Sequence, residues 1–344
     1  MNEMSRWTAR TVMAATLVLA WVTQAADPAD LPEGVRRGSY MGWNNALYIE
    51  ADDVNYLTVV VPEIGGRIAF YGHGAENIIY ENRASAGKIL GRAKEPFTVG
   101  GYQLDIGPEL RGIPEHQNLW MGPYSWTAPR DHNVVVTSDA DKSLGVRLEK
   151  SITFDPEKGD VGLVQRLINA GTEDIRHCLW DRTLCVGGGY AIIPLAKKSR
   201  FPAKWSLRRP VGDEGKYTYD GANPAADNVH VFDNVLVAKA GGTPMKLGAD
   251  SDAGWLAYTA GRLLLIKYFP YESKGNYTDG GNSVEFYTDA QVAELEPLSP
   301  EVTVKPGENY AFPEKWSLIV LNEPVKSFEE ARALVKKITP FKFK

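Results

Sequence analysis

The stretch SVEFYTDAQVAELE, residues 283–296, decides the fold class expected for this chain. Branched and aromatic residues alternate in it with polar ones, which is typical of a β-strand with two unlike faces. On one continuous strand alternate residues share a face, so its apolar face would end in two carboxylates. That face would carry Val284, Phe286, Ala290, Val292, Glu294 and Glu296. A bulge near Asp289 is the alternative, and it would turn both glutamates to solvent.

Similar short runs recur along the chain, separated by Gly, Pro, Asn and Asp. Their composition and spacing predict an all-β protein, a sandwich of antiparallel sheets. The further candidate strands are 46–51, 56–62, 67–72, 133–139, 145–155, 160–169, 175–186, 230–239, 254–260, 262–269 and 316–322.

One helix is expected near the C-terminus. Ser327 and Glu330 have the spacing of a capping box, in which each side chain bonds the other residue's backbone N–H. Apolar residues then follow at helical spacing: Phe328, Ala331, Leu334 and Ile338. This pattern predicts a helix that lies on the outside of a sheet.

Two long segments lack a clear strand pattern and are interpreted as loops: about 82–130 and about 201–228. Loops of this length in a compact domain are usually functional or partly disordered. Both are rich in aromatic and polar residues, which can stack on sugar rings and bind their hydroxyl groups, but which can equally serve packing. In the first segment the candidate ligand contacts are Asp105, Glu109 and Trp120, and His116 is the candidate proton donor.

The N-terminus predicts an export signal over residues 1–25. Arg6 and Arg10 precede an apolar run over 12–22, and small residues follow it up to Ala25. The run is too short to cross a bilayer, which needs roughly 20 residues, so no membrane segment is expected after signal removal. Residues 26–344 show no repeat or linker and are interpreted as a single domain in a periplasmic or secreted protein.

Composition excludes several other classes of protein. With 38 basic and 43 acidic residues the net charge is -5, which gives no attraction for nucleic acid. Only Cys178 and Cys185 are present, and seven residues apart on one strand they are expected to be free, buried thiols. No HExxH, GxSxG or P-loop spacing occurs, so neither a metal nor a cofactor is predicted.

The run IRHCLWDRT, residues 175–183, is a second candidate for ligand contact. On a strand, Trp180 and Arg182 share one face while His177 and Asp181 share the other. An indole ring and a guanidinium group side by side can hold a sugar. The alternative is that Arg182 pairs with a glutamate and only balances charge.

These stretches together resemble the galactose mutarotase-like superfamily. The resemblance rests on the order of YLTVVVPEIGGRIAFYG (56–72), GGYQLDIGPE (100–109), LINAGTEDIRHCLWDRT (167–183) and AELEPLSPEVTVKPGENYAFPEKWSLI (293–319). It implies a β-supersandwich with a sugar site on a concave sheet surface. Arg67 recurs in the resembled pattern, as a sugar contact or as a structural residue at a strand start. Relatives include epimerases and binding domains, so fold alone does not fix the activity.

The resemblance also implies a catalytic pair. In the epimerases a glutamate accepts the proton of the anomeric hydroxyl, and a histidine gives one to the ring oxygen. AELEPLSP resembles the segment with the glutamate, so Glu294 or Glu296 is the expected base, and Glu294 is preferred because Glu296 adjoins Pro297. Where epimerases carry the histidine, in a strand resembling TNHSYF, this chain reads LWDRT, and His116 is the preferred substitute over His177.

The leading hypothesis is therefore an exported carbohydrate-active protein that binds a sugar or oligosaccharide. Its enzymatic version is aldose 1-epimerase-type proton transfer by Glu294 or Glu296 with His116. The alternatives are a non-catalytic carbohydrate-binding protein, and a lyase or hydrolase that acts on a polysaccharide. The sequence predicts neither the sugar nor the oligomeric state.

Overall fold

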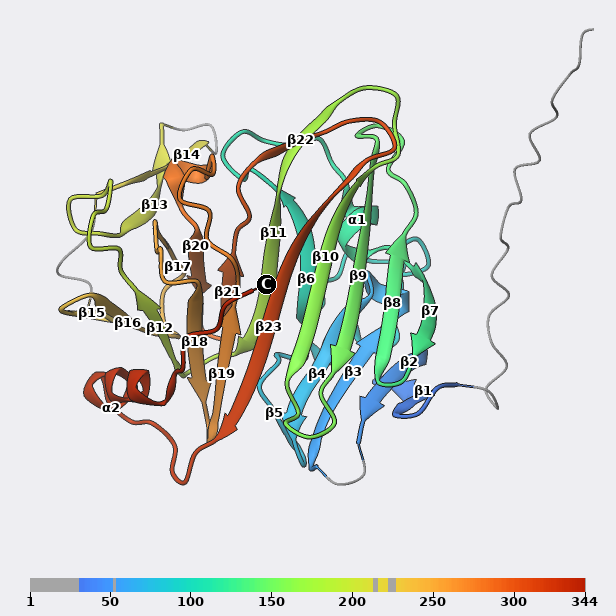
Figure 1. Cartoon of the computed structure of the whole chain (residues 1–344), viewed down its shortest axis with the longest axis horizontal. Helices are drawn as coiled ribbons and strands as arrows, with labels where there is room; N and C mark the ends of the chain where they lie inside the picture. Colours follow the sequence, from blue (N-terminus) through green and yellow to red (C-terminus); the bar gives the residue numbers. More distant parts are fainter. Residues whose placement is uncertain (1–30, 52–53, 213–215, 222–226, 344) are drawn as a thin grey trace, which may run out of the picture.

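The computed structural model describes residues 31–51, 54–212, 216–221 and 227–343. The predicted signal segment, residues 1–25, lies outside these ranges. Within them the chain forms two antiparallel sheets packed face to face, as the sequence predicts (Figure 1).

The first sheet has 13 strands, and 11 of them follow one path. In spatial order these are β1 (Val35–Tyr40), β2 (Trp43–Glu50), β3 (Tyr56–Val61), β4 (Arg67–His73), β6 (Gly101–Gly107), β11 (Ile175–Val186), β21 (Val292–Pro297), β20 (Val284–Thr288), β17 (Met245–Ala249), β13 (Ser206–Val211) and β14 (Lys216–Asp220). The short strands β5 (Glu76–Asn77) and β22 (Val302–Val304) pair with β4 and β11.

The second sheet has ten strands. Their spatial order is β15 (Val229–Phe232), β16 (Val235–Lys239), β12 (Tyr190–Pro194), β18 (Trp255–Ala260), β19 (Leu263–Tyr268), β23 (Asn309–Val320), β10 (Val161–Asn169), β9 (Val146–Phe154), β8 (Asn133–Ser138) and β7 (Tyr124–Arg130).

The main core lies between the two sheets, because each contributes its alternate apolar residues to it. Leu104, Leu179 and Leu295 enter from the first sheet, and Leu265 and Trp316 from the second, all at most 1% exposed. The residues between them on β6, β11 and β21 therefore point to the opposite face of the first sheet.

The core also contains a polar cluster. Asp181 points inward from β11 and pairs with Lys267 of β19, whose Nζ lies 2.8 Å from the Thr183 hydroxyl and 3.4 Å from Glu314. Burial, and then the charge of Glu314, raises the pKa of Asp181. Two carboxyl groups thus share one ammonium group. This arrangement explains why charged residues are tolerated on inward positions.

The segment 283–296 is a hairpin and not one continuous strand. β20 ends at Thr288, β21 begins at Val292, and Phe286 faces Leu295 across the pair. The Asp289 side chain accepts hydrogen bonds from the backbone N–H groups of Gln291 and Val292, which closes the turn. The expectation of one shared face was therefore wrong: Phe286 points into the core, while the glutamates of β21 point away from it.

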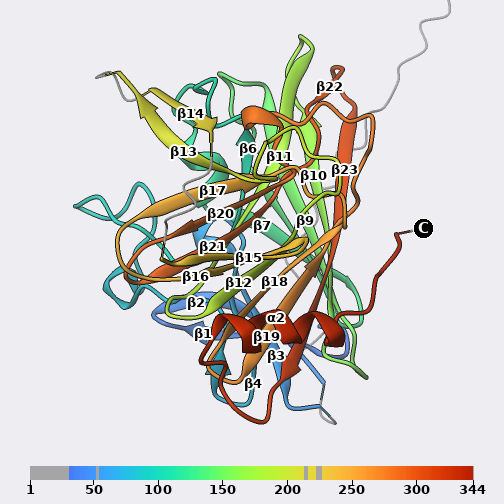
Figure 2. The ribbon, with the colours of Figure 1, turned by 90° about the vertical axis from the view of Figure 1, so that its left-hand side faces the viewer.

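The C-terminal helix forms where it was predicted. Helix α2 (Phe328–Ala333) begins after Ser327, whose hydroxyl accepts the Glu330 N–H at 3.2 Å. The reciprocal bond differs from the expectation, because the Glu330 carboxylate accepts the Lys326 N–H. Ala331 and Leu334 are buried in an apolar cluster with Ile192 and Val237 of the second sheet. Figure 2 shows α2 lying over this sheet.

The two segments predicted as long loops contain regular structure. β6, the short helix α1 (Gln117–Met121) and β7 lie in the first, and β13 and β14 form a hairpin in the second. Their strands mix charged, glycine and aromatic residues, which weakens the strand pattern in the sequence. As predicted, Cys178 and Cys185 are free and buried. No helix in the described part of the chain is long and apolar enough to span a membrane.

Candidate functional site

Polar and aromatic side chains gather on the outer face of the first sheet, over the neighbouring strands β6, β11, β21, β20 and β17. Figure 1 shows these strands in the sheet. Register brings them together: Trp180 of β11 lies opposite Asp105 of β6, and Glu285 of β20 lies opposite Glu296 of β21. Because these strands come from four distant parts of the sequence, only the folded sheet assembles the group.

A hollow of about 390 Å³ opens over this group. Its volume lies in the range of small-molecule sites, roughly 300–1,000 Å³. Its charged and aromatic lining residues are Tyr80, Glu109, Trp180, Arg182, Arg208, Lys246, Tyr287, Asp289, Glu294 and Glu296. We refer to it as the first hollow.

Lys246 lies at the centre of a carboxylate cluster. Its Nζ is 2.8 Å from Glu296, 3.0 Å from Glu285 and 3.0 Å from Glu109. Burial lowers the pKa of Lys246, but the charges of the three glutamates outweigh burial and leave that pKa raised. The side chain is therefore an ammonium group that holds three carboxyl groups together.

The Asn282 amide also bonds Glu285, and Gly248 makes room for it, because a Cβ at this glycine would lie 2.1 Å from the Asn282 amide nitrogen. Glycine at position 248 therefore allows Asn282 to reach Glu285.

Trp180 connects this cluster to Arg182. Its indole N–H donates to Glu296 Oε2 at 2.7 Å, and its ring centroid lies 4.4 Å from Lys246 Nζ and 4.8 Å from Arg182 Cζ. Both cations interact favourably with the ring, and the hydrogen bond fixes its orientation. Only 8% of Trp180 is exposed, so its partners hold it in the wall of the hollow.

Arg182 joins two further carboxylates. Its Nε and Nη2 donate to Glu294 Oε2 at 3.3 and 3.2 Å, and its Nη1 lies 3.7 Å from Asp105. Asp105 in turn pairs with His116 Nε2 at 2.9 Å. The result is a series of side chains of alternating charge: Glu294, Arg182, Asp105 and His116. It runs from the first hollow to the loop before α1.

His116 sits at the far end of this chain. Its Nδ1 is 2.6 Å from the Pro114 carbonyl, so both ring nitrogens face acceptors. Burial lowers the pKa of His116, but the hydrogen bond and charge of Asp105 outweigh burial and leave that pKa raised. Asp105 therefore stabilises the imidazolium form of His116, and the ring contacts Asp105 and not the first hollow.

Glu296 is the most perturbed carboxyl group of the first hollow. Burial raises its pKa to about 8, although the nearby charge of Lys246 acts in the opposite direction. Its Oε2 accepts from both Trp180 and Lys246, while its buried Oε1 has no hydrogen-bond partner among the described residues. A proton on Glu296 would therefore sit on Oε1, which is free to donate.

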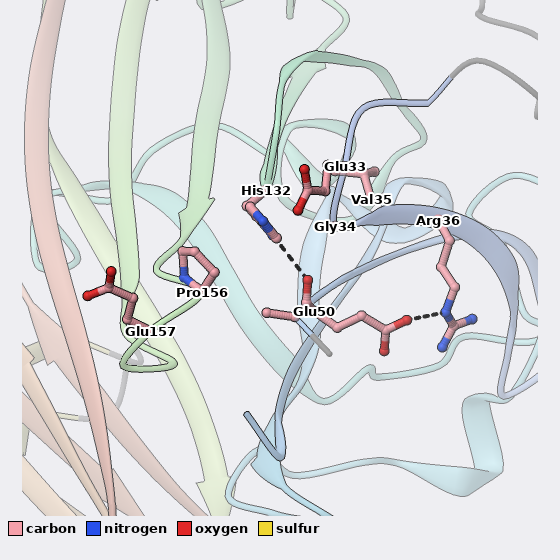
Figure 3. Close-up of a pocket in the computed structure, with 9 residues that line it drawn as sticks. Glu33, Gly34, Val35, Arg36, Glu50, His132, Pro156 and Glu157 are labelled. Carbon is pink, nitrogen blue, oxygen red and sulfur yellow. Dashed lines mark hydrogen bonds and ion pairs between the residues drawn. The ribbon is translucent and has the colours of Figure 1, made fainter. Parts of the chain in front are cut away.

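A separate hollow of about 420 Å³ lies near the edge strand β1. Figure 3 shows His132 directed at the Glu50 backbone carbonyl and Arg36 paired with the Glu50 carboxylate. Gly34 has a φ of 70°, and a Cβ there would lie 1.8 Å from the His132 ring, so the chain needs glycine at this close approach. No predicted ligand-binding residue lines this hollow, and the ring-bearing residues in its wall are His132 and Pro156.

Comparison with known proteins identifies the architecture. No family model matches the chain, and no curated protein matches it. Several solved structures do match the chain in fold. A galactose mutarotase-like protein from Lactobacillus casei shares 10% identity with a TM-score of 0.55, over 79% of this chain and 100% of that one. The chain has the galactose mutarotase-like fold.

Two more solved structures are similar to this chain. Galactose 1-epimerase from Lactobacillus acidophilus shares 12% identity with a TM-score of 0.51, over 85% of this chain and 100% of that one. The Slr1438 protein from Synechocystis shares 13% identity with a TM-score of 0.52, over 82% and 98%. At these identities the likeness establishes the mutarotase-like fold alone.

The residues predicted for ligand contact occupy different places in this mutarotase-like fold. Five of them line the first hollow: Glu109, Trp180, Arg182, Glu294 and Glu296. Asp105 and His116 form the supporting chain behind Arg182.

Arg67 and Trp120 lie elsewhere. Arg67, 1% exposed, donates to the Gly100 and Trp120 carbonyls and to Gln103, so it ties β4 to the neighbouring segments. The half-buried Trp120 ring packs against the apolar cluster around Met121 and Val61.

Sequence reasoning missed several residues of the site. Lys246, Arg208 and Tyr287 line the first hollow, and Glu285 is a buried partner of Lys246. A local signal existed for two of them, because Glu285 and Tyr287 alternate with the core residues Val284 and Phe286. Lys246 similarly stands alone among apolar and small residues on β17. Arg208 lacked such a signal, because its strand was interpreted as a loop; it pairs with Glu109 at 3.1 Å.

The raised pKa of Glu296 predicts a pH-dependent stability. Between about pH 4.5 and 8 the folded state binds more protons than the unfolded state, so the free energy of unfolding falls as the pH rises. One such group contributes a slope of up to about 1.4 kcal/mol per pH unit. Urea unfolding of Glu296→Gln from pH 5 to pH 8 should show a weaker decline than the wild type, whereas the exposed control Glu95→Gln should follow the wild type. Equal slopes for all three proteins would disprove the assignment.

Proposed function

We propose that this protein binds an uncharged aldose in the first hollow and interconverts its anomers by proton transfer. The observation that carries the proposal is the pair Glu294 and Glu296. They occupy alternate positions on the outer face of β21, one paired with Arg182 and the other with a raised pKa and an unpartnered Oε1. One carboxylate and one protonated carboxyl group on the same hollow form a general base and a general acid.

The proposed reaction balances with these two groups. The Glu294 carboxylate accepts the proton of the anomeric hydroxyl while Glu296 donates its Oε1 proton to the ring oxygen. The bond between C1 and the ring oxygen breaks, and an open-chain aldehyde forms. After rotation about the C1–C2 bond, the hydroxyl attacks the aldehyde from the other side. Glu296 regains its proton, and Glu294 returns one to the new anomeric oxygen.

His116 has a supporting role in this scheme. Since it contacts Asp105 and not the hollow, we assign it to positioning: His116 holds Asp105, which faces Arg182, which orients Glu294. The proton donor expected from the sequence is thus replaced by Glu296 in the proposal.

The charge pattern favours an uncharged sugar. The three cations that line the hollow each have a carboxylate partner: Arg182 pairs with Glu294, and Arg208 and Lys246 pair with Glu109. A phosphate or carboxylate on the ligand would have to displace one of these partners, which leaves a buried charge uncompensated.

A non-catalytic binding protein is the second candidate. It is favoured by the complete burial of Glu296, which is 0% exposed and must be reached by the ligand for the reaction to proceed. In this version Trp180 and the polar groups of the hollow hold the sugar, and no proton moves.

The test compares catalysis with binding. NMR exchange spectroscopy of glucose, galactose and mannose should show faster anomer interconversion with protein than with buffer, and calorimetry should detect binding of the same sugar. Binding without faster interconversion would select the non-catalytic candidate. Absence of both for every aldose would reject the proposed function.

The proposal includes export to the periplasm or the medium. It rests on the sequence pattern of residues 1–25, which lie outside the described ranges. Determination of the N-terminus of protein recovered from those fractions checks it, with Ala26 as the expected first residue; an intact N-terminus would reject it.

A further inference from the structure

A second hollow of about 360 Å³ lies beside the first. It is built by residues of the segment between β5 and β6 that the proposed reaction does not use. Its lining includes Ser85, Lys88, Pro96 and Phe97. Asn82 and Thr98 line both hollows, so these two residues form their common border.

The border is polar and fixed. The Asn82 amide nitrogen donates to the Thr98 carbonyl at 2.9 Å and to the Thr98 hydroxyl at 3.1 Å. Its amide oxygen accepts the Ala84 N–H at 3.1 Å. Thr98 is exposed, and its hydroxyl can still donate one hydrogen bond to a ligand that crosses the border.

The second hollow also carries an aromatic surface. Phe97 is half-buried against the apolar cluster around Trp43 and Val99, which holds its ring in place. Pro96 is exposed beside it, and Lys88 Nζ lies 5.9 Å from the ring centroid. Apolar ring surface with polar groups around it matches the two-sided chemistry of a sugar unit.

The two hollows therefore repeat one pattern on either side of a polar border. The first has Trp180 with charged hydrogen-bonding groups, and the second has Phe97 with Lys88 and with Thr98 at the border. A ligand of one sugar unit in the first hollow would leave the second hollow without an occupant. A ligand of linked units would use both.

We propose that the site takes a short uncharged oligosaccharide, with its reducing-end unit in the first hollow and the next unit over Phe97. The orientation follows because only the reducing end has an anomeric hydroxyl, and Glu294 lies in the first hollow. This inference rests on the proposed function and adds the size class of its ligand.

Calorimetry with matched ligand series tests it. Kd is measured for glucose, galactose and mannose and for their homologous disaccharides and trisaccharides. The disaccharide of the preferred sugar is expected to bind about tenfold more tightly than the monosaccharide. Phe97→Ala should remove that gain and leave the monosaccharide Kd unchanged, which also shows that the variant is folded. Phe341→Ala, a substitution at an exposed phenylalanine away from both hollows, is the control and should retain the full gain.

The outcomes separate the inference from the proposed function. Equal Kd values for one, two and three units would overturn the inference and leave the proposed function standing. A disaccharide gain that persists in Phe97→Ala would also overturn it. Failure of every sugar to bind at any length would overturn both.

Discussion

Replacement of Glu294 by glutamine is expected to slow anomer interconversion by about 10²- to 10⁴-fold, because a positioned general base contributes that much. The glutamine keeps the size of the side chain, and its amide oxygen can still accept from Arg182, which lies 3.2 Å from Glu294 Oε2. It cannot accept the hydroxyl proton. Initial rates by polarimetry or NMR exchange measure the effect.

The control and the binding data make this result specific. Glu157 lines the separate hollow of Figure 3, and Glu157→Gln should leave the rate unchanged. Sugar affinity of Glu294→Gln should change little, because the reaction step is lost and not the contact surface. An unchanged rate in Glu294→Gln, with affinity intact, would show that another group removes the proton.

Much of the fold follows from local patterns. Alternation predicted β11 as one strand, and its faces are as expected: Leu179 enters the core, while Trp180 and Arg182 line the hollow. The capping residue Ser327 placed the start of α2 correctly. Such features depend on neighbours within a few residues, which is the range over which a sequence pattern acts directly.

The parts that were not predicted depend on pairing between distant segments. The turn at Asp289 reverses the chain, so Glu296 shares a face with Glu285 instead of Phe286. The prediction that the glutamates border an apolar face was wrong for this reason, because period-2 reasoning assumes that the strand continues.

Lys246 illustrates the same limit at the site. Its partners come from two other parts of the sequence: Glu109 follows β6, and Glu285 and Glu296 belong to the hairpin of β20 and β21. Only the sheet order β21, β20, β17 brings the hairpin beside Lys246. A lone lysine between apolar residues is a sign of a partner on the non-core face. The sequence does not show that this partner is a group of three.

Lys246→Met is therefore expected to destabilise the protein by about 3–5 kcal/mol at pH 8, because loss of one partner leaves buried charges uncompensated. The methionine preserves most of the volume, so the loss comes from the ammonium group. Since Glu285 and Glu296 have raised pKa values, they can take up protons at pH 5, and the loss should be smaller there. Urea unfolding at both pH values measures the loss of stability.

The exposed control Lys305→Met should lower the free energy of unfolding little at either pH. Addition of Glu285→Gln to Lys246→Met should recover part of the stability at pH 8, because one of the repelling charges is gone. A loss below about 1 kcal/mol at pH 8 would mean that the three carboxyl groups are already neutral without the lysine, and the acid–base division between Glu294 and Glu296 would lose its electrostatic basis. An equal and large loss at both pH values would mean that proton uptake by Glu285 and Glu296 does not relieve the lost charge pairing.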